Sequence, residues 1–258
     1  MSMPMPLSAL PQSPAGFYAM NNQFLVNGPK GFTEVKMLEN EDMFVRMDLP
    51  GVPEEGVVVS LDLPNKTVTI YGYAPEVHTH DLSDREYITM STLVCNCCDV
   101  SGFTSHMSDG VLRLLISKTF INPQIRHASS WISFLADPSF PEDLRVTDPH
   151  DPTLTGPELM PHPYVLEGSD LAYESKQLPN GSLYLRLDMP GVPKDNFTVS
   201  VDNGRVMVTG QAPAVGHDSG GRFYSGAVAM LPTDGDIPSS RIRTIIKNGV
   251  IRLIIPHI

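Results

Sequence analysis

Cysteine and histidine side chains are the residues of this chain best suited to metal or redox chemistry. Zinc sites prefer two cysteines separated by two residues, whereas neighbouring residues of an extended Cys-x-Cys-Cys segment point to opposite faces. The spacing therefore favours ordinary buried or edge thiols, with redox sensitivity as an alternative. We expect no metal site and no cofactor. The residues concerned are Cys95, Cys97 and Cys98, with His78, His80 and His106 as the possible further ligands.

Carboxylates and histidines elsewhere offer little for acid–base catalysis. His78, His80 and Asp81 lie in a polar connection after Ala74-Pro75, where solvated loop residues are expected. Asp48 and Asp188 occupy equivalent places before two Pro-Gly steps, which predicts a structural hydrogen bond or a surface charge instead of a catalytic pair. Nucleophile-elbow, zinc-protease and phosphate-loop motifs do not occur. We therefore expect that the chain is not an enzyme.

Charge and composition exclude several classes of partner. The chain of 258 residues has 18 basic and 29 acidic side chains and a formal net charge of -11, which would repel a phosphate backbone. Its apolar runs are shorter than the ~20 residues that a membrane helix needs. The odd number of cysteines and the lack of a secretory pattern predict a reducing compartment, cytoplasm or nucleus.

An internal repeat organises the chain. The stretch from Arg46 to Pro53 (RMDLPGVP) recurs from Arg186 to Pro193 (RLDMPGVP). Shifting the sequence by 140 residues gives thirteen identities over the 29 positions from Glu34 to Asp62. So many matches predict two homologous domains of about 85 residues, a suitable size for separate β-sandwiches.

Each repeat contains a tight turn between two strands. Proline fixes one backbone angle and glycine permits a left-handed one, so Pro50-Gly51 and Pro190-Gly191 are predicted structural turns. Apolar residues alternate before and after them, which is the pattern of half-buried strands. We expect strands near 33–38, 43–49, 56–62, 67–73, 86–94, 103–107 and 111–117, and near 171–177, 183–189, 196–202, 205–210, 222–231, 241–246 and 250–255.

Proline-rich segments separate and precede the two repeats. We predict a flexible Met/Pro-rich N-terminal arm over 1–32, a first domain over 33–118, a linker over 119–170 and a second domain over 171–258. Few contacts are expected across the linker, so each domain should fold alone. Its apolar island from Trp131 to Leu135 either caps one sandwich as a short helix or docks as an extended segment.

These motifs together resemble the α-crystallin domain of small heat shock proteins. The resemblance rests on the two Pro-Gly-Val turns, the Asn203-Gly204-Arg205-Val206 hairpin, Leu231-Pro232 and the closing Asn248-Gly249-Val250. The second copy carries the whole pattern, and the first is degenerate from Cys95 to Val100. The tandem arrangement is most similar to divergent plant members. The fold that the resemblance implies is all-β: two tandem immunoglobulin-like α-crystallin-type β-sandwiches joined by a proline-rich linker.

The resemblance to this family implies binding to other proteins. Two functions remain open: an ATP-independent chaperone or co-chaperone that binds exposed apolar segments, and a non-chaperone adaptor in a larger, nuclear complex. Two rows of apolar residues are either plain core or walls of a partner groove. The groove candidates are Val57, Val59 and Leu61 in the first copy and Phe197, Val199 and Val201 in the second.

Two assembly devices of the family are missing from the sequence. No Ile-x-Ile tail follows the closing strand, and only twelve residues, Gln211 to Arg222, stand where a longer loop carries a swapped strand. Two copies tethered in one chain favour pairing with each other. We therefore expect a monomer or small oligomer with intrachain domain pairing, and no direct binding to nucleic acid or membrane.

Overall fold

The computed structural model describes residues 16–18, 22–64, 66–93, 98–121, 131–132, 145–146, 162–231 and 237–257. Within these ranges the secondary structure is β-strand with three short 3-10 turns, and no helix is long and apolar enough to cross a membrane. The strands before the second repeat are β1 (Gly16–Tyr18), β2 (Leu25–Asn27), β3 (Thr33–Met37), β4 (Met43–Asp48), β5 (Val57–Asp62), β6 (Thr67–Ala74), β7 (Arg85–Leu93), β8 (Cys98–Ser108), β9 (Val111–Phe120), β10 (Trp131–Ile132) and β11 (Arg145–Val146).

The remaining strands repeat the same pattern. They are β12 (Val165–Glu167), β13 (Tyr173–Gln177), β14 (Leu183–Asp188), β15 (Phe197–Asp202), β16 (Arg205–Ala212), β17 (Arg222–Met230), β18 (Arg243–Lys247) and β19 (Val250–Ile255). The 3-10 turns are η2 (Glu54–Gly56), η5 (Lys194–Asn196) and η6 (Ser239–Arg241). The all-β expectation is confirmed, and the expected strands agree with the observed ones to within a few residues, except that β8 is longer at both ends.

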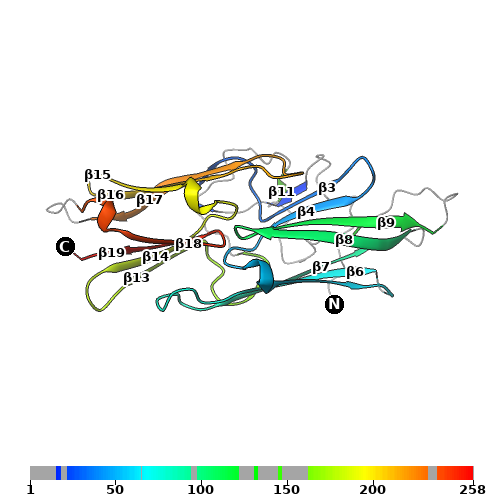
Figure 1. Ribbon diagram of the computed structural model, residues 1–258, viewed down its shortest axis with the longest axis horizontal. Helices are drawn as coiled ribbons and strands as arrows, with labels where there is room; N and C mark the ends of the chain where they lie inside the picture. Colours follow the sequence, from blue (N-terminus) through cyan, green and yellow to red (C-terminus); the bar gives the residue numbers. More distant parts are fainter. Residues whose placement is uncertain are drawn as a thin grey trace.

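Four antiparallel sheets form two pairs. In the first pair the strand orders are β11-β1-β3-β4-β9-β8 and β10-β7-β6-β5, with β12 also paired to β7. In the second pair they are β13-β14-β19-β18 and β15-β16-β17-β2. We call these pairs the first half and the second half. Figure 1 shows an elongated molecule with the first half on the right and the second on the left, and the hairpins β8–β9 and β18–β19 directed toward the middle.

Each half encloses its own apolar core. Alternate residues of β4, β6 and β9 fill the first core, among them Val45, Ile70 and Leu114. The second core repeats this with Leu185, Val208 and Leu253. Close packing of two such faces is the arrangement that stabilises a sandwich of two sheets.

Two segments cross from one half to the other. Strand β2 pairs with β17 of the second half, and Phe24 and Leu25 are buried in its core. Strand β12 pairs with β7 of the first half, and Tyr164 is buried in that core. The stretch 22–32 thus differs from the flexible arm expected there, and the contacts between the halves are many where few were expected. The residue boundaries proposed for the domains stay a prediction.

The apolar island of the linker contributes an extended segment. Trp131 and Ile132 form β10, whose backbone pairs with Leu93 and Thr92 at the end of β7. The extended alternative therefore describes these two residues better than a helical cap. Residues 133–135 lie outside the described ranges.

Candidate protein-binding edges and the junction between the halves

The two Pro-Gly turns hold the halves together through backbone hydrogen bonds. Gly51 and Gly191 have φ of 95° and 87°, which confirms the predicted left-handed angle. The Gly51 N–H donates to the carbonyl of Asn248 and the Gly191 N–H to the carbonyl of Asp109, each at 2.8 Å. Each turn thus binds the hairpin tip of the opposite half.

Glycine at the hairpin tips permits this close approach. A Cβ added to Gly110 would lie 2.4 Å from the carbonyl oxygen of Asn248, and one on Gly249 would lie 2.3 Å from that of Asp109. Both glycines also have positive φ, 70° and 67°. Any other residue would therefore push the two tips apart.

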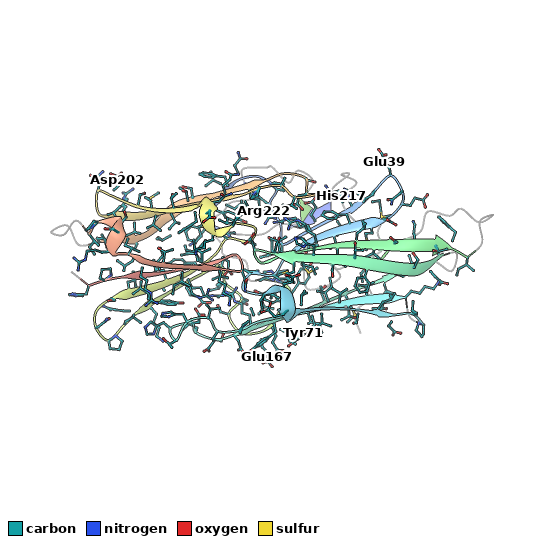
Figure 2. The ribbon with its side chains drawn as sticks, in the orientation of Figure 1. Glu39, Tyr71, Glu167, Asp202, His217 and Arg222 are labelled. Atoms are coloured by element: carbon teal, nitrogen blue, oxygen red, sulfur yellow. The ribbon has the colours of Figure 1, made fainter. Side chains whose placement is uncertain are left out.

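Buried ion pairs connect the halves beside these turns. The Arg222 guanidinium donates to Asp48 at 2.6 Å, and Arg85 donates to Asp188 at the same distance. All four side chains are at most 7% exposed. Figure 2 shows Arg222 near the middle of the molecule. A carboxylate buried without its partner would be costly, so each pair requires both halves.

Asp48 and Asp188 therefore have structural roles, as expected, but neither is a surface charge. Each carboxylate is paired with an arginine of the opposite half. The charge on the paired carboxylates raises the pKa of Arg85 and Arg222 above the usual range, although burial opposes that rise.

The connection after each Ala-Pro step places a carboxylate against an arginine in the other half. Arg186 and Arg252 stand opposite each other on β14 and β19, and Asp81 accepts from Arg252 Nε at 2.8 Å. The Tyr184 hydroxyl also donates to Asp81. Burial alone would raise the pKa of Asp81, but these donors hold it well below its usual range.

The second half returns the same contact. Arg46 and Arg113 stand opposite each other on β4 and β9, and Asp218 accepts from Arg113 Nη2 at 2.7 Å. The ring of His217 packs against Phe44 with centroids 5.5 Å apart. Two facing arginines repel each other, and each connection supplies a carboxylate to one of them from the opposite half.

The predicted solvated loop around Asp81 is therefore wrong. Asp81 is 7% exposed, and its neighbours His78 and His80 pack on the Tyr184 ring at centroid distances of 5.3 and 5.6 Å. The sequence shows only a polar stretch here, because the partner of Asp81 is Arg252, which lies 171 residues away. The short connection 211–222 also reaches the opposite half, through Asp218.

Two equivalent polar residues anchor the crossing segments. Asn22 donates its amide to the Asp188 carbonyl at 2.8 Å and accepts the Phe24 N–H. His162, 140 residues later, bonds the Asp48 carbonyl through Nε2 at 2.8 Å, and its Nδ1 accepts the Tyr164 N–H. The second bond requires an unprotonated Nδ1, so the imidazole is neutral with its proton on Nε2. Burial lowers the pKa of His162 to about 4.

The groove candidates lie on strands at the ends of their sheets. Val57, Val59 and Leu61 alternate along β5, half-buried against the first core, with Phe103 of β8 also packed against it. Phe197, Val199 and Val201 do the same along β15, where Ile246 of β18 lies on the same core. Among the described strands, β5 and β15 each pair on one side only. Both rows therefore face inward beside a backbone edge that is open to pairing.

The cysteine cluster is described only at Cys98. Cys98 is buried in the first core, and this burial raises the pKa of its thiol. Cys95 and Cys97 lie outside the described residues. His106 is exposed on β8. Within the described ranges, no group of three His, Cys, Asp or Glu side chains is placed to hold a metal ion.

Comparison with known proteins gives consistent matches. A family model described as "Predicted plant small heat shock protein" matches residues 4–258. A 57 kDa heat shock protein of Arabidopsis thaliana is 39% identical over 85% of this chain and 56% of its own length, so the chain spans about half of that relative. A 14.7 kDa heat shock protein of Arabidopsis thaliana is 32% identical over 35% of the chain and 68% of itself. A mitochondrial 22 kDa heat shock protein of Glycine max is 29% identical over 29% of the chain and 35% of itself.

Proposed function

The chain belongs to the family of predicted plant small heat shock proteins, and from that membership we propose an ATP-independent chaperone or co-chaperone that binds exposed apolar segments of other proteins. The three relatives described above bear heat-shock names. The proposed setting is the heat-stress response of a plant cell.

One observation carries the proposal: β5 and β15 each combine an open backbone edge with a half-buried apolar row. An extended segment of an unfolding protein can hydrogen-bond to such an edge while its side chains contact the row. The edges of β7 and β17, by contrast, are covered by β12 and β2 of the same chain. Binding is therefore assigned to the β5 and β15 edges.

Suppression of aggregation tests this proposal. A heat-denatured client is followed by light scattering without nucleotide, in the presence of the wild-type chain or of a Val59→Thr, Val199→Thr double variant. Threonine keeps nearly the volume of valine but makes the row more polar. The double variant should suppress aggregation less, while Val26→Thr, a control at a 58% exposed position, should match the wild type. Equal suppression by all three, or none by the wild type, would reject binding at these edges.

A second candidate function is a non-chaperone adaptor that docks a specific partner in a larger complex. The nucleus is one proposed location of that complex. The buried ion pairs and crossed hairpins favour the adaptor, because they fix the two halves as one body with preset surfaces. A wild-type chain that suppresses no aggregation yet binds one defined partner at a fixed ratio would support the adaptor.

The proposed state is a monomer or small oligomer in which the two copies pair within the chain. The buried pairs between the halves support it, since they occupy surfaces that separate chains would otherwise share. Light scattering at micromolar concentration tests the size, and a large uniform particle would contradict it. The proposed compartment is the cytoplasm or nucleus, supported by the odd number of cysteines and tested by imaging a fluorescent fusion.

A further inference from the structure

The outer face of the sheet formed by β5, β6, β7 and β12 carries apolar side chains that the core does not use. Val58 stands opposite Tyr71 in the register of β5 and β6, and Tyr71 stands opposite Ile88 in that of β6 and β7. Val58 is 56% exposed and Ile88 is 40% exposed. Leu166 on β12, 58% exposed, extends the set at the far strand. We call Val58, Tyr71, Ile88 and Leu166 the outer apolar row.

The second half is polar at three of the four equivalent places, whereas Val26, at the place of Leu166, is again apolar and 58% exposed. The equivalents of Val58, Tyr71 and Ile88 are Thr198, Thr209 and Ser225, which follow the same strand register. Thr198 and Thr209 bond to each other through their hydroxyls at 2.6 Å. The fold therefore does not require apolar residues at these places, since the second copy forms the same sheet without them. An exposed apolar patch that the fold does not need marks a binding surface.

Carboxylates line one side of the outer apolar row. Glu86 of β7 stands directly opposite Glu167 of β12 in the strand register. Like charges at such a pair destabilise a sheet. The second copy has Phe223 and Asn27 at the equivalent positions, so the fold does not demand this pair of charges either. Figure 2 shows Tyr71 and Glu167 on the same side of the molecule, at its lower surface in that view.

The tyrosines of β6 extend the acidic side. The Tyr73 hydroxyl donates to Asp84 at 3.0 Å, and Glu86 stands opposite Tyr73 in the register of β6 and β7. Three carboxylates thus gather beside two aromatic rings. A lysine or arginine side chain suits this setting, because the carboxylates attract its charge and a tyrosine ring face binds cations.

We propose that this face is a docking site for a protein segment that combines apolar residues with lysine or arginine. The apolar residues of the partner would cover the outer apolar row, and a basic side chain would lie between Glu86 and Glu167. The site lies on the opposite face of β5 from the inward row of Val57, Val59 and Leu61, so it is separate from the proposed chaperone edge. It exists in one copy only and gives the chain one such partner per molecule.

Synthetic peptides test the proposal on the full chain. Three labelled ten-residue peptides are compared by fluorescence anisotropy: alternating Leu and Lys, alternating Leu and Glu, and alternating Ser and Lys. The Leu-Lys peptide should bind most tightly, and added salt should weaken this binding. Equal binding of the Leu-Glu peptide would overturn the basic partner, and equal binding of the Ser-Lys peptide would overturn the role of the apolar row.

The second copy provides the matched variant. Replacing Val58→Thr, Tyr71→Thr and Ile88→Ser copies residues that already fold at these places, and should raise the Kd for the Leu-Lys peptide about tenfold, equivalent to ~1.4 kcal/mol. The reverse exchange, Thr198→Val, Thr209→Tyr and Ser225→Ile, serves as control and should leave the wild-type site intact. An unchanged Kd in the copied variant would overturn the site. Self-association of the wild type that the copied variant abolishes would also overturn it, because a second copy would then be the occupant.

The acidic pair has its own readout. Glu167→Gln removes the repulsion with Glu86, so it should raise the midpoint of thermal unfolding. The same variant should bind the Leu-Lys peptide less tightly, and that binding should depend less on salt. A purely structural role would change stability alone. A variant that unfolds at a higher temperature and binds the peptide as well as the wild type would overturn the basic anchor.

Discussion

Replacing His162 by asparagine should remove a defined part of the pH dependence of folding. The buried imidazole must stay neutral because Nδ1 accepts the Tyr164 N–H while Nε2 bonds the Asp48 carbonyl. Asparagine makes the equivalent pair of bonds at Asn22, where its amide donates to Asp188 and its oxygen accepts from Phe24. His162→Asn therefore copies a residue that already works at this place and does not titrate.

The magnitude follows from the lowered pKa of His162. Its pKa falls from 6.5 to about 4 on folding. Between these values the unfolded chain binds more protons than the folded chain, so the free energy of unfolding decreases as the pH is lowered. Acidification from about pH 7.5 to about pH 5 should cost ~2 kcal/mol through this residue alone. Below the folded pKa its contribution stays constant.

Urea unfolding at the two pH values measures the effect. Carboxylates such as Asp81 and Asp218 are common to both chains, so their contribution cancels in the comparison. The wild type should lose ~2 kcal/mol more than His162→Asn between the two conditions. Equal losses would refute the neutral buried imidazole. A larger loss in the variant would show that the asparagine does not reproduce the bonds of Asn22.

Other predictions concern the junction between the halves. Gly249→Ala should destabilise the chain by more than ~2 kcal/mol in urea unfolding, because Gly249 has a positive φ and lies close to the Asp109 carbonyl. The control Gly102→Ala should change the stability little, because no heavy atom lies near the added Cβ. Similar losses of stability in the two variants would contradict the close approach of the hairpin tips. Arg222→Met should cost ~3 kcal/mol by removing one of the two arginines paired with the buried Asp48, which leaves only Arg46; adding Asp48→Asn should recover part of this loss, and no recovery would argue against the pair. Two fragments, 1–150 and 151–258, should associate one to one in light scattering and should regain the circular dichroism of β-strands only when they are mixed. If each fragment folded stably by itself, the expectation of independent folding would be correct after all.

Local patterns predicted the strands and turns well. The alternation in β5 and β15 is a property of six neighbouring residues. The left-handed angles of Gly51 and Gly191 are predicted by the proline that precedes each glycine. Such features depend on sequence neighbours, so a pattern of period two and a repeat are enough to find them. The inward rows were found for the same reason, although their role as binding walls stays a prediction.

The junction could not be read in this way. The partner of Asp81 is Arg252, and that of Asp48 is Arg222, so neither pair leaves a local pattern. A polar stretch such as 78–81 looks solvated until its buried partner is known. The crossing of β2 and β12 did leave a weak signal in the repeat.

That signal extends the repeat further toward the N-terminus. Phe24-Leu25-Val26 and Tyr164-Val165-Leu166 are equivalent apolar triplets, and each is followed two residues later by glycine, Gly28 or Gly168. Both glycines have positive φ, 104° and 95°. Including these triplets would have moved the starts of both repeats before residues 33 and 171. The opposite half to which each triplet docks would still have required the structure.

Pairing inside one polypeptide changes how the junction responds to dilution. Two separate chains joined by the same ion pairs and crossed tips would come apart as their concentration fell, and their unfolding temperature would follow it. Here both sides belong to one chain, so they are synthesised together in a fixed ratio of one to one. The junction can open and close, but its equilibrium contains no concentration term. The two copies can also differ in sequence, so the paired halves resemble a heterodimer whose subunits are joined in one polypeptide.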